Sequence, residues 1–237
     1  QNLKLRKGFQ MLSERPFIFA GALCLICSFM LTFAASSLKP MQLKNQMIDK
    51  QKNILKVLSV TTGDKKYTNE EIDQLYKTYI KNKWVDEKGK LVDTETNSPI
   101  FLYIKEGQID AYAIPISGYG LWSTLYGYFS VDGDGTTVRG ITFYEHGETP
   151  GLGAEVEAKW FQDNFIGKKI ASETGEFKSV AIVKGKVENS IKPHQRQYYV
   201  DGISGATVTS NGVTSFLKEA LMKYESFSKK LRERGQA

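Results

Sequence analysis

An unbroken apolar run near the N-terminus constrains the fold of this chain more than any other feature. Residues 16–35 read PFIFAGALCLICSFMLTFAA and contain no charged side chain. A helix of about 20 residues rises roughly 30 Å, which matches the hydrocarbon core of a bilayer. A cleaved signal peptide and a buried core helix are the alternatives. Because the apolar part of a signal peptide has only about 7–15 residues and the flanking sequence here is polar, the run predicts one transmembrane helix over residues 16–36.

Charges near the run do not decide its orientation. Four basic residues precede it, and five lysines follow it within residues 37–56. The positive-inside rule therefore gives no clear answer. The net charge is +6, of which the first fifteen residues carry +3, from four basic residues and Glu14. Acidic and basic residues are interspersed in the remainder, which carries only +3, so no basic surface for a nucleic acid is expected.

The two cysteines do not indicate a metal site. Cys24 and Cys27 lie in the apolar run, three residues apart and hence on one face of a helix. They could be two metal ligands or small apolar side chains. No histidine or acid lies nearby, which favours the second interpretation. The rest of the chain has no cysteine and can enter an oxidising compartment without forming disulfides.

The sequence after the apolar run predicts an α+β domain. Apolar residues at mostly helical spacing predict a helix over residues 43–58. Thr68 and Glu71 form a capping box, and an apolar stripe predicts a helix over residues 68–84. Apolar segments around turn residues then predict two hairpins, of residues 100–105 with 109–116 and of residues 125–131 with 136–145.

The second half of the domain returns to helices. We expect a short helix over residues 160–166, strands over 177–187 and 197–203, and a long amphipathic helix from Val213 to Leu231 that ends at Gly235. The expected fold is a mostly antiparallel sheet with flanking helices, attached to the N-terminal transmembrane helix. DGDG at residues 132–135 resembles the start of a calcium loop, but position twelve holds no glutamate, so a tight turn is expected.

Few catalytic or metal-binding patterns are present. The chain has two histidines, His146 and His194, and lacks GxGxxG and GxxxxGK[ST]. GISGA at residues 202–206 differs from the GxSxG pattern of serine hydrolases, because the second glycine comes one position early. We therefore expect neither hydrolysis at Ser204 nor a metal site.

The stretch DGISGATVTSNG, residues 201–212, concentrates glycines and hydroxyls before the last helix. The first-turn amides and the dipole of a helix favour an anion such as phosphate by about 0.3–2 kcal/mol. Ser210 or Asn211 could instead cap the helix without any ligand. Spacing alone leaves both interpretations open.

The residues DGISGAT resemble the flavinylation motif of the FMN-binding domain family, in which the threonine of the SGAT unit carries FMN through a phosphoester bond. This resemblance implies that Thr207 is the acceptor, with Thr209 as a weaker candidate. The surrounding recognition residues would be Asp201, Ser204, Gly205 and Ala206.

Two further segments resemble flavin-contacting loops of that family. HGETPGLGAE, residues 146–155, is also explained by a Pro-Gly turn. The resemblance implies polar contacts from Glu148 and Thr149 and packing of Leu152 on the ring, with His146 either a flavin contact or a solvent-facing residue. The remaining residues of this loop expected at the flavin are Gly151 and Gly153.

The second of these segments is GYGLWSTLYGYF, residues 118–129. In it, Leu121 and Trp122 could cover a flavin face while Ser123 bonds the polar edge of the ring, although aromatic residues in such a stretch also pack in cores.

The order of these segments resembles the family formed by the C subunits of sodium-translocating NADH:quinone oxidoreductases. The G subunits of ferredoxin:NAD oxidoreductases are one alternative, and a non-redox module that binds a phosphate ligand is another. The resemblance implies a membrane-anchored flavoprotein subunit that relays electrons toward quinone, with sodium transport. It also implies partner subunits and a flavin transferase that moves FMN from FAD, while this chain alone would not perform the complete catalysis.

The resemblance also implies an arrangement across the bacterial inner membrane. Residues 1–15 would be cytoplasmic, residues 16–36 would span the membrane once, residues 37–66 would form a membrane-proximal helix and linker, and residues 67–237 would form a periplasmic FMN-binding domain.

Overall fold

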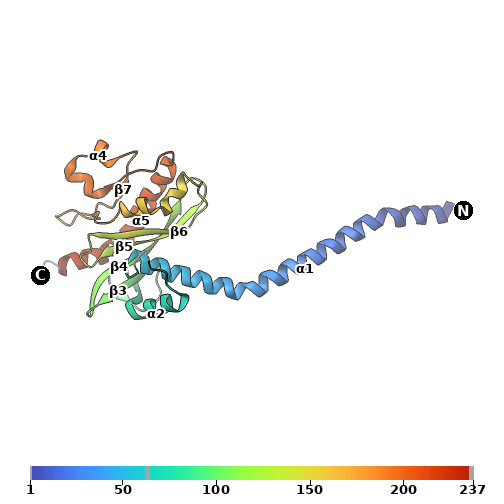
Figure 1. Ribbon diagram of the computed structural model, residues 1–237, viewed down its shortest axis with the longest axis horizontal. Helices are drawn as coiled ribbons and strands as arrows, with labels where there is room; N and C mark the ends of the chain where they lie inside the picture. The colour runs from blue at the N-terminus through green and yellow to red at the C-terminus, as the bar shows by residue number, and fades with distance from the viewer. Residues whose placement is uncertain (1, 62–64, 235–237) are drawn as a thin grey trace. The chain divides into compact units, whose positions relative to one another are not determined.

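The computed structural model describes residues 2–61 and 65–234. The chain divides into two compact units, Gln1–Met47 and Ile48–Ala237, and helix α1 (Asn2–Val57) contributes to both (Figure 1). The predicted helices over residues 16–36 and 43–58 thus belong to one continuous helix.

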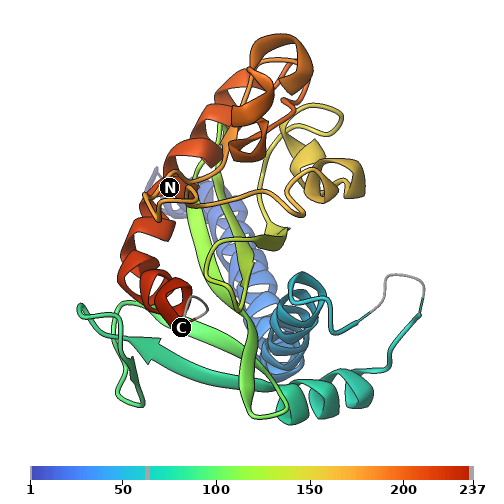
Figure 2. The same ribbon diagram turned by 90° about the vertical axis from the view of Figure 1, so that its left-hand side faces the viewer.

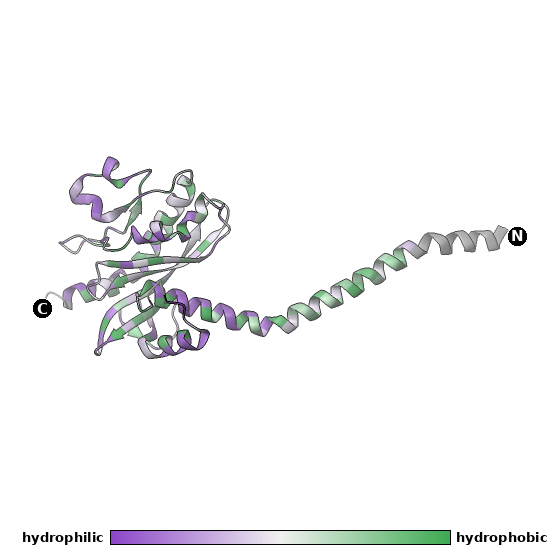
Figure 3. Cartoon of the chain, viewed as in Figure 1, coloured by the Kyte–Doolittle hydropathy of each residue, from purple (hydrophilic) through white to green (hydrophobic). Residues whose placement is uncertain are grey.

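The apolar part of α1 is long enough to cross a membrane. The helix from Pro16 to Val57 contains a window with a mean hydropathy of 2.3, none of which is buried within the structure. Figure 3 shows this middle part of α1 in green and the more polar C-terminal part with purple residues. Cys24 and Cys27 are both free and exposed on the helix surface.

A six-stranded antiparallel sheet forms the centre of the second unit, in the order β2-β1-β3-β4-β5-β6. Both predicted hairpins are confirmed. In the first hairpin, Glu106 and Gly107 have φ of 52° and 79°, as a two-residue turn with the twist of the strands requires. The strands are β1 (Ile80–Val85), β2 (Leu91–Val92), β3 (Pro99–Lys105), β4 (Gln108–Tyr119), β5 (Thr124–Asp132) and β6 (Val138–Glu145).

Helices cover both faces of this sheet, and the side chains of β4 point alternately to the two faces. Tyr112 and Ile114 pack in the larger core with helix α5 (Thr207–Arg234). Ala111 and Ala113 face the other way and pack in a second cluster with Leu55 of α1 and with residues of helix α2 (Asn69–Tyr79). Figure 2 shows the red helix α5 on one side of the sheet strands and the blue and green-blue helices α1 and α2 on the other. This period of two follows from the strand geometry. The antiparallel sheet with helices on both faces confirms the expected α+β class.

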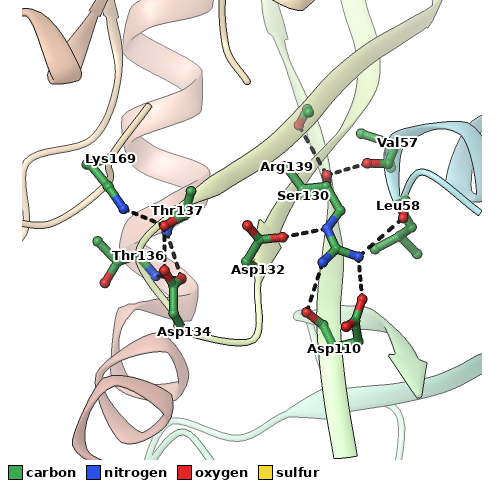
Figure 4. A network of polar contacts seen from close by, with 11 residues as sticks. Val57, Leu58, Asp110, Ser130, Asp132, Asp134, Thr136, Thr137, Arg139 and Lys169 are labelled. Carbon is green, nitrogen blue, oxygen red and sulfur yellow. Dashed lines mark hydrogen bonds and ion pairs between the residues drawn. The ribbon is translucent and has the colours of Figure 1, made fainter. Parts of the chain in front are cut away.

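The C-terminal end of α1 is fastened to the sheet by polar contacts (Figure 4). The hydroxyl of Ser130 donates a 2.5 Å hydrogen bond to the carbonyl of Val57. Arg139 donates to the carbonyl of Leu58 and forms ion pairs with Asp110 and Asp132. These bonds satisfy carbonyls that a helix end leaves without partners.

The predicted capping box of α2 is confirmed, but the predicted end of that helix is wrong. Thr68 accepts the amide of Glu71, and the Glu71 carboxylate accepts the amide of Thr68. The helix ends at Tyr79, and residues 80–85 form β1, which pairs with β3. Pairing of the sheet edge and burial of Ile80 therefore override the helical spacing of the apolar stripe.

The segment between β6 and α5 is mostly irregular. The predicted helix at residues 160–166 is present as α3 (Lys159–Asp163), whereas the predicted strands over residues 177–187 and 197–203 are reduced to a parallel pair of two-residue strands. Ser179 and Gly185 have φ of 64° and 82°, and such residues interrupt an extended strand. The remaining elements are η1 (Gly153–Glu157), β7 (Ala181–Ile182), α4 (Val187–Ser190), η2 (Pro193–Tyr198) and β8 (Tyr199–Val200).

The long C-terminal helix is confirmed, but it begins six residues before the predicted Val213. Helix α5 starts at Thr207 and its described part ends at Arg234. The predicted end at Gly235 lies outside the described residues.

Candidate functional site

A tight turn leads into α5. The amide of Ala206 donates a 3.2 Å hydrogen bond to the carbonyl of Ile203, and Gly205 between them has a φ of +74°. A positive φ at the third position of a β-turn is the requirement of a type II turn and favours glycine. The first turn of the helix follows, with the amide of Ser210 bonded to the carbonyl of Ala206 at 2.9 Å. Since the helix begins at Thr207 and both Ser210 and Asn211 lie within it, the prediction that one of them caps the helix is wrong.

The hydroxyls of this stretch have different environments. Thr207 and Ser204 are exposed, whereas Thr209 is only 1% exposed and Ser210 only 4% exposed. Thr209 donates a 2.6 Å hydrogen bond to the carboxylate of Glu148. Of the two threonines considered as acceptors, therefore, only Thr207 is exposed to solvent.

Glu148 joins the three segments that the sequence singled out. Its carboxylate accepts the amides of Leu121, Trp122 and Ser123, at distances of 2.9–3.2 Å, in addition to the hydroxyl of Thr209. Glu148 itself is 5% exposed. Burial alone would raise its pKa, but the hydrogen bonds from Thr209 and the three amides outweigh burial, and the pKa is lowered. A charged carboxylate at this point thus holds two loops and the first turn of α5 together.

Glycines let these segments approach the carboxylate closely. A Cβ on Gly120 would lie 2.7 Å from Oε1 of Glu148, and one on Gly153 would lie 2.6 Å from Oε2 and 2.8 Å from Oγ1 of Thr209. A Cβ on Gly212 of α5 would lie 2.2 Å from the carbonyl oxygen of Tyr119. Gly120 and Gly212 were not predicted as site residues, although the glycine-rich spacing of both segments was a signal for close backbone packing.

The loop TPGLG forms a turn and also contacts the turn before α5. The carbonyl of Thr149 accepts the amides of Leu152 and Ala154 at 3.1 Å, and Gly151 has a φ of +73°. A Cβ on Gly205 would lie 2.7 Å from the Leu152 side chain, so the two turns pack against each other. The expected Pro-Gly turn is therefore present, and it places the exposed Leu152 beside the turn that precedes Thr207.

The segment before β5 presents apolar side chains to solvent. The amide of Gly120 donates a 2.9 Å hydrogen bond to the carbonyl of Ser123 and closes a narrow bend. Within this bend Leu121 is 52% exposed and Trp122 is 70% exposed. Trp122 is thus not a core residue. The hydroxyl of Ser123 accepts the amide of Gly147 at 2.6 Å and so joins this bend to the TPGLG loop.

His146 and Asp201 support neighbouring backbone. Nδ1 of His146 accepts the amide of Glu148 at 3.2 Å, and its side chain is mostly buried rather than facing solvent. The carboxylate of Asp201 accepts the amide of Val187 at 2.8 Å and the ammonium of Lys186 at 2.7 Å. Burial opposes the charge of Asp201, but these two hydrogen bonds prevail and lower its pKa. Asp201 thereby fixes the loop before α4 next to the turn of residues 202–205.

A cavity of about 350 Å³ lies between that loop and the start of α5. It is lined by residues 182–186, by the turn of residues 202–205, and by Thr207, Ser210 and Asn211. The arrangement suits a ligand with a phosphate and a flat apolar ring: an exposed hydroxyl at a helix N-terminus, a cavity beside it, and the exposed side chains of Leu121, Trp122 and Leu152 on the neighbouring loops.

Known proteins resemble this chain over most of its length. The FMN-binding domain family matches residues 120–222, which include residues 146–155 and 201–212 and all but the first two residues of the segment 118–129. The C subunit of the Na(+)-translocating NADH-quinone reductase of Pseudomonas aeruginosa is 33% identical, with 93% of this chain and 97% of that protein aligned. The C subunit of the Yersinia pestis reductase is 34% identical over 89% of this chain and 90% of its own length.

Two crystal structures have a similar fold. The C subunit of the Na(+)-translocating NADH-quinone reductase of Parabacteroides distasonis superposes with a TM-score of 0.69 at 37% identity, covering 81% of this chain and 96% of that one. NqrC of Shewanella oneidensis superposes with a TM-score of 0.64 at 25% identity, covering 80% and 98%. The resemblance inferred from the three segments is confirmed, and the chain belongs to the family formed by the C subunits of Na(+)-translocating NADH-quinone reductases.

Proposed function

We propose that this chain carries FMN through a phosphoester bond to Thr207. The exposure of Thr207 carries the proposal, because the other threonine of the first turn, Thr209, is buried and bonded to Glu148. The position at a helix N-terminus beside a cavity supports it, since such positions favour phosphate. The matching FMN-binding domain includes this residue.

Attachment requires a donor and a partner. FAD would be the donor and a flavin transferase the partner that moves its FMN half, and the hydroxyl oxygen of Thr207 would form a bond to the phosphorus of that half. The bond between that phosphorus and the bridging oxygen of the pyrophosphate breaks, AMP leaves, and the proton of the hydroxyl balances the charge on AMP. The other groups of the proposed site are the recognition residues Asp201, Ser204, Gly205 and Ala206.

Bound FMN would supply electron transfer to and from other redox centres of the complex, toward quinone and coupled to sodium transport. Leu121, Trp122 and Leu152 present the apolar surface that would cover the ring. Thr149 and Ser123, on the same loops, would make polar contacts with the flavin. The hydroxyl of Ser123 already accepts the amide of Gly147. Glu148 would act by holding the loops, because its carboxylate is buried. Gly151 and Gly153 would shape the loop that carries Leu152.

The proposed location is the bacterial inner membrane, crossed once, with the globular unit on the periplasmic side. The length and hydropathy of α1 after Pro16 support a membrane anchor. In this arrangement residues 1–15 are cytoplasmic, residues 16–36 span the bilayer, residues 37–66 are membrane-proximal and residues 67–237 are periplasmic. Other subunits of the complex would hold the NADH site and the sodium path.

The test of covalent attachment is fluorescence that survives denaturation. The full chain is produced with a flavin transferase, denatured and separated on a gel, and the modified peptide is identified by mass spectrometry. We expect flavin fluorescence on the native chain, its loss in Thr207→Val, and its retention in Thr78→Val, a matched change at an exposed site of α2. Flavin that leaves in denaturant, or that is found on Thr209, contradicts the proposal.

A further inference from the structure

The cavity beside Thr207 has the features of a phosphate site. Its walls include two lysines, Lys184 and Lys186, and the first turn of a 28-residue helix. Among the described residues that line it, none is acidic. Lys186 is bound to Asp201, whereas Lys184 is exposed, so its positive charge is available to a ligand.

Ser210 is an independent sign of a ligand in this cavity. It is 4% exposed and lines the cavity, and its Oγ is buried without a hydrogen-bond partner. A buried hydroxyl without a partner is unfavourable by about 1–3 kcal/mol, so one that persists calls for a group that it bonds. Elsewhere on α5, by contrast, the hydroxyl of Thr214 donates to the carbonyl of Ser210 at 3.0 Å, as hydroxyls on a helix commonly do.

Helical spacing brings this hydroxyl next to Thr207. Residues three and four positions apart lie on one face of a helix, which places Thr207, Ser210 and Asn211 together on the cavity wall. The first hydrogen bond inside the helix is the one from Ser210 to Ala206. The amides of Thr207 and Thr209 precede it and are therefore free to bind an anion at the helix end.

We propose that this cavity is the phosphoryl site of flavin attachment, in which the Ser210 hydroxyl and the first-turn amides bind the phosphoryl oxygens. The inference rests on the proposed attachment at Thr207 and adds that the acceptor chain itself stabilises the transfer. As the Thr207 oxygen bonds to phosphorus and the bond to the AMP half of FAD breaks, charge on the phosphoryl oxygens meets donors that are already in position. Lys184 adds a positive charge at the exposed side of the cavity. After transfer, the same donors hold the phosphodiester.

Ser210→Ala separates this role from a structural one. Removing a buried hydroxyl that lacks a partner is neutral or stabilising for the fold, so the variant should fold at least as well as the native chain. Attachment should nevertheless slow by about a hundredfold, the lower end of the range for losing one such donor. The matched control is Ser215→Ala, which changes an exposed serine of the same helix that contacts Glu219.

The experiment follows attachment to the full chain in detergent with FAD and a flavin transferase, by in-gel fluorescence over time. The ³¹P NMR signal of the attached phosphodiester is then compared between variants under native conditions. We expect Ser210→Ala to slow attachment and to shift the ³¹P signal, and Ser215→Ala to do neither. Lys184→Ala, on an exposed side chain, should slow attachment less and weaken its dependence on salt.

Two results overturn different proposals. If the native chain gains flavin at Thr207 while Ser210→Ala has the native rate and the native ³¹P shift, the phosphoryl site is wrong and the attachment stands. If the native chain gains no flavin at Thr207, the proposed function fails, and the phosphoryl site fails with it.

Discussion

The hydroxyl of Thr209 donates a 2.6 Å hydrogen bond to the buried carboxylate of Glu148, 61 residues earlier in the chain. Through this bond the first turn of α5 is fixed to the same carboxylate that binds the amides of Leu121, Trp122 and Ser123. The two threonines of that turn are separated by about 200° around the helix axis, because each residue turns the chain by about 100°. Holding Thr209 inward therefore turns Thr207 toward solvent, as the proposed attachment requires.

Replacing Glu148 by glutamine should destabilise the globular unit. The amide keeps the shape of the side chain but exchanges an acceptor oxygen for a donor, which then faces amide and hydroxyl donors in a buried site. Hydrogen bonds to charged groups contribute about 1.5–3 kcal/mol, so we expect a loss of that order in the free energy of unfolding. Urea unfolding of the full chain in detergent measures it, with Glu145→Gln, an exposed site on β6, as the control. Equal stability of the two variants would contradict the role of Glu148.

The contact between Glu148 and Thr209 should appear as an energetic coupling. In a double-mutant cycle with Glu148→Gln and Thr209→Val, residues that share a hydrogen bond typically show a coupling of about 0.5–3 kcal/mol. Additive effects in urea unfolding would mean that the 2.6 Å bond does not contribute to stability. Glu148→Gln with Ser117→Ala, an exposed site on β4, provides a pair that should be additive.

Stability should fall in acid, and Glu148 should account for part of that fall. Folding lowers the pKa of Glu148 and of Asp201 below their ordinary values of 4.5 and 3.8. A group with a lowered folded pKa stabilises the fold fully above its unfolded pKa, and this contribution is lost as the pH falls through the folded pKa. Melting temperatures measured from pH 7 down to about pH 3 should therefore decrease below about pH 4.5. The decrease should be shallower in Glu148→Gln, and an unchanged slope would exclude a lowered pKa at this residue.

Replacing either of two glycines in the TPGLG loop should lower the stability of the fold, for a different reason at each position. At Gly153 a Cβ would lie 2.6 Å from the Glu148 carboxylate. The loss in the free energy of unfolding should therefore increase with side-chain size, from about 1–3 kcal/mol for alanine. At Gly151 nothing lies within 4 Å, but φ is +73°. Asparagine adopts such a φ more easily than valine does, so Gly151→Asn should unfold at higher urea than Gly151→Val. Equal loss for both changes at Gly151 would contradict this assignment.

Local signals in the sequence were sufficient for part of this fold. The Thr68–Glu71 capping box and the Glu106–Gly107 turn depend on neighbours in the chain, and both are present as predicted. The end of α2 was missed because Ile80 pairs with Tyr103 of β3, a partner that helical spacing does not reveal. The strand predicted over residues 177–187 failed similarly, since Ser179 has a φ of 64° and its amide donates to the carbonyl of Ile170, a partner that the local pattern does not reveal.

For the site, the sequence identified the segments but not the contacts between them. The resemblance identified the three segments, which the structure brings together, but it assigned Glu148 to the flavin ring. No spacing rule indicates that this carboxylate reaches the amide of Trp122, 26 residues earlier. The resemblance already favoured Thr207 over Thr209, and the start of α5 adds a physical reason for that preference. Once the helix is known to begin at Thr207, its periodicity places the two side chains on nearly opposite faces.

Trp122 provides a test of where the ring lies. Trp122 is 70% exposed on a bend that Glu148 holds, and the proposed attachment places this side chain against the ring. An indole in contact with a flavin quenches the fluorescence of the flavin, because it donates an electron to the excited ring. In native, flavin-loaded protein we therefore expect Trp122→Leu to brighten the flavin, with an unchanged yield of attached flavin on a denaturing gel. Trp160→Leu changes another exposed tryptophan, on α3, and should leave the brightness as it is. Equal brightness of the two variants would mean that the ring does not rest on Trp122.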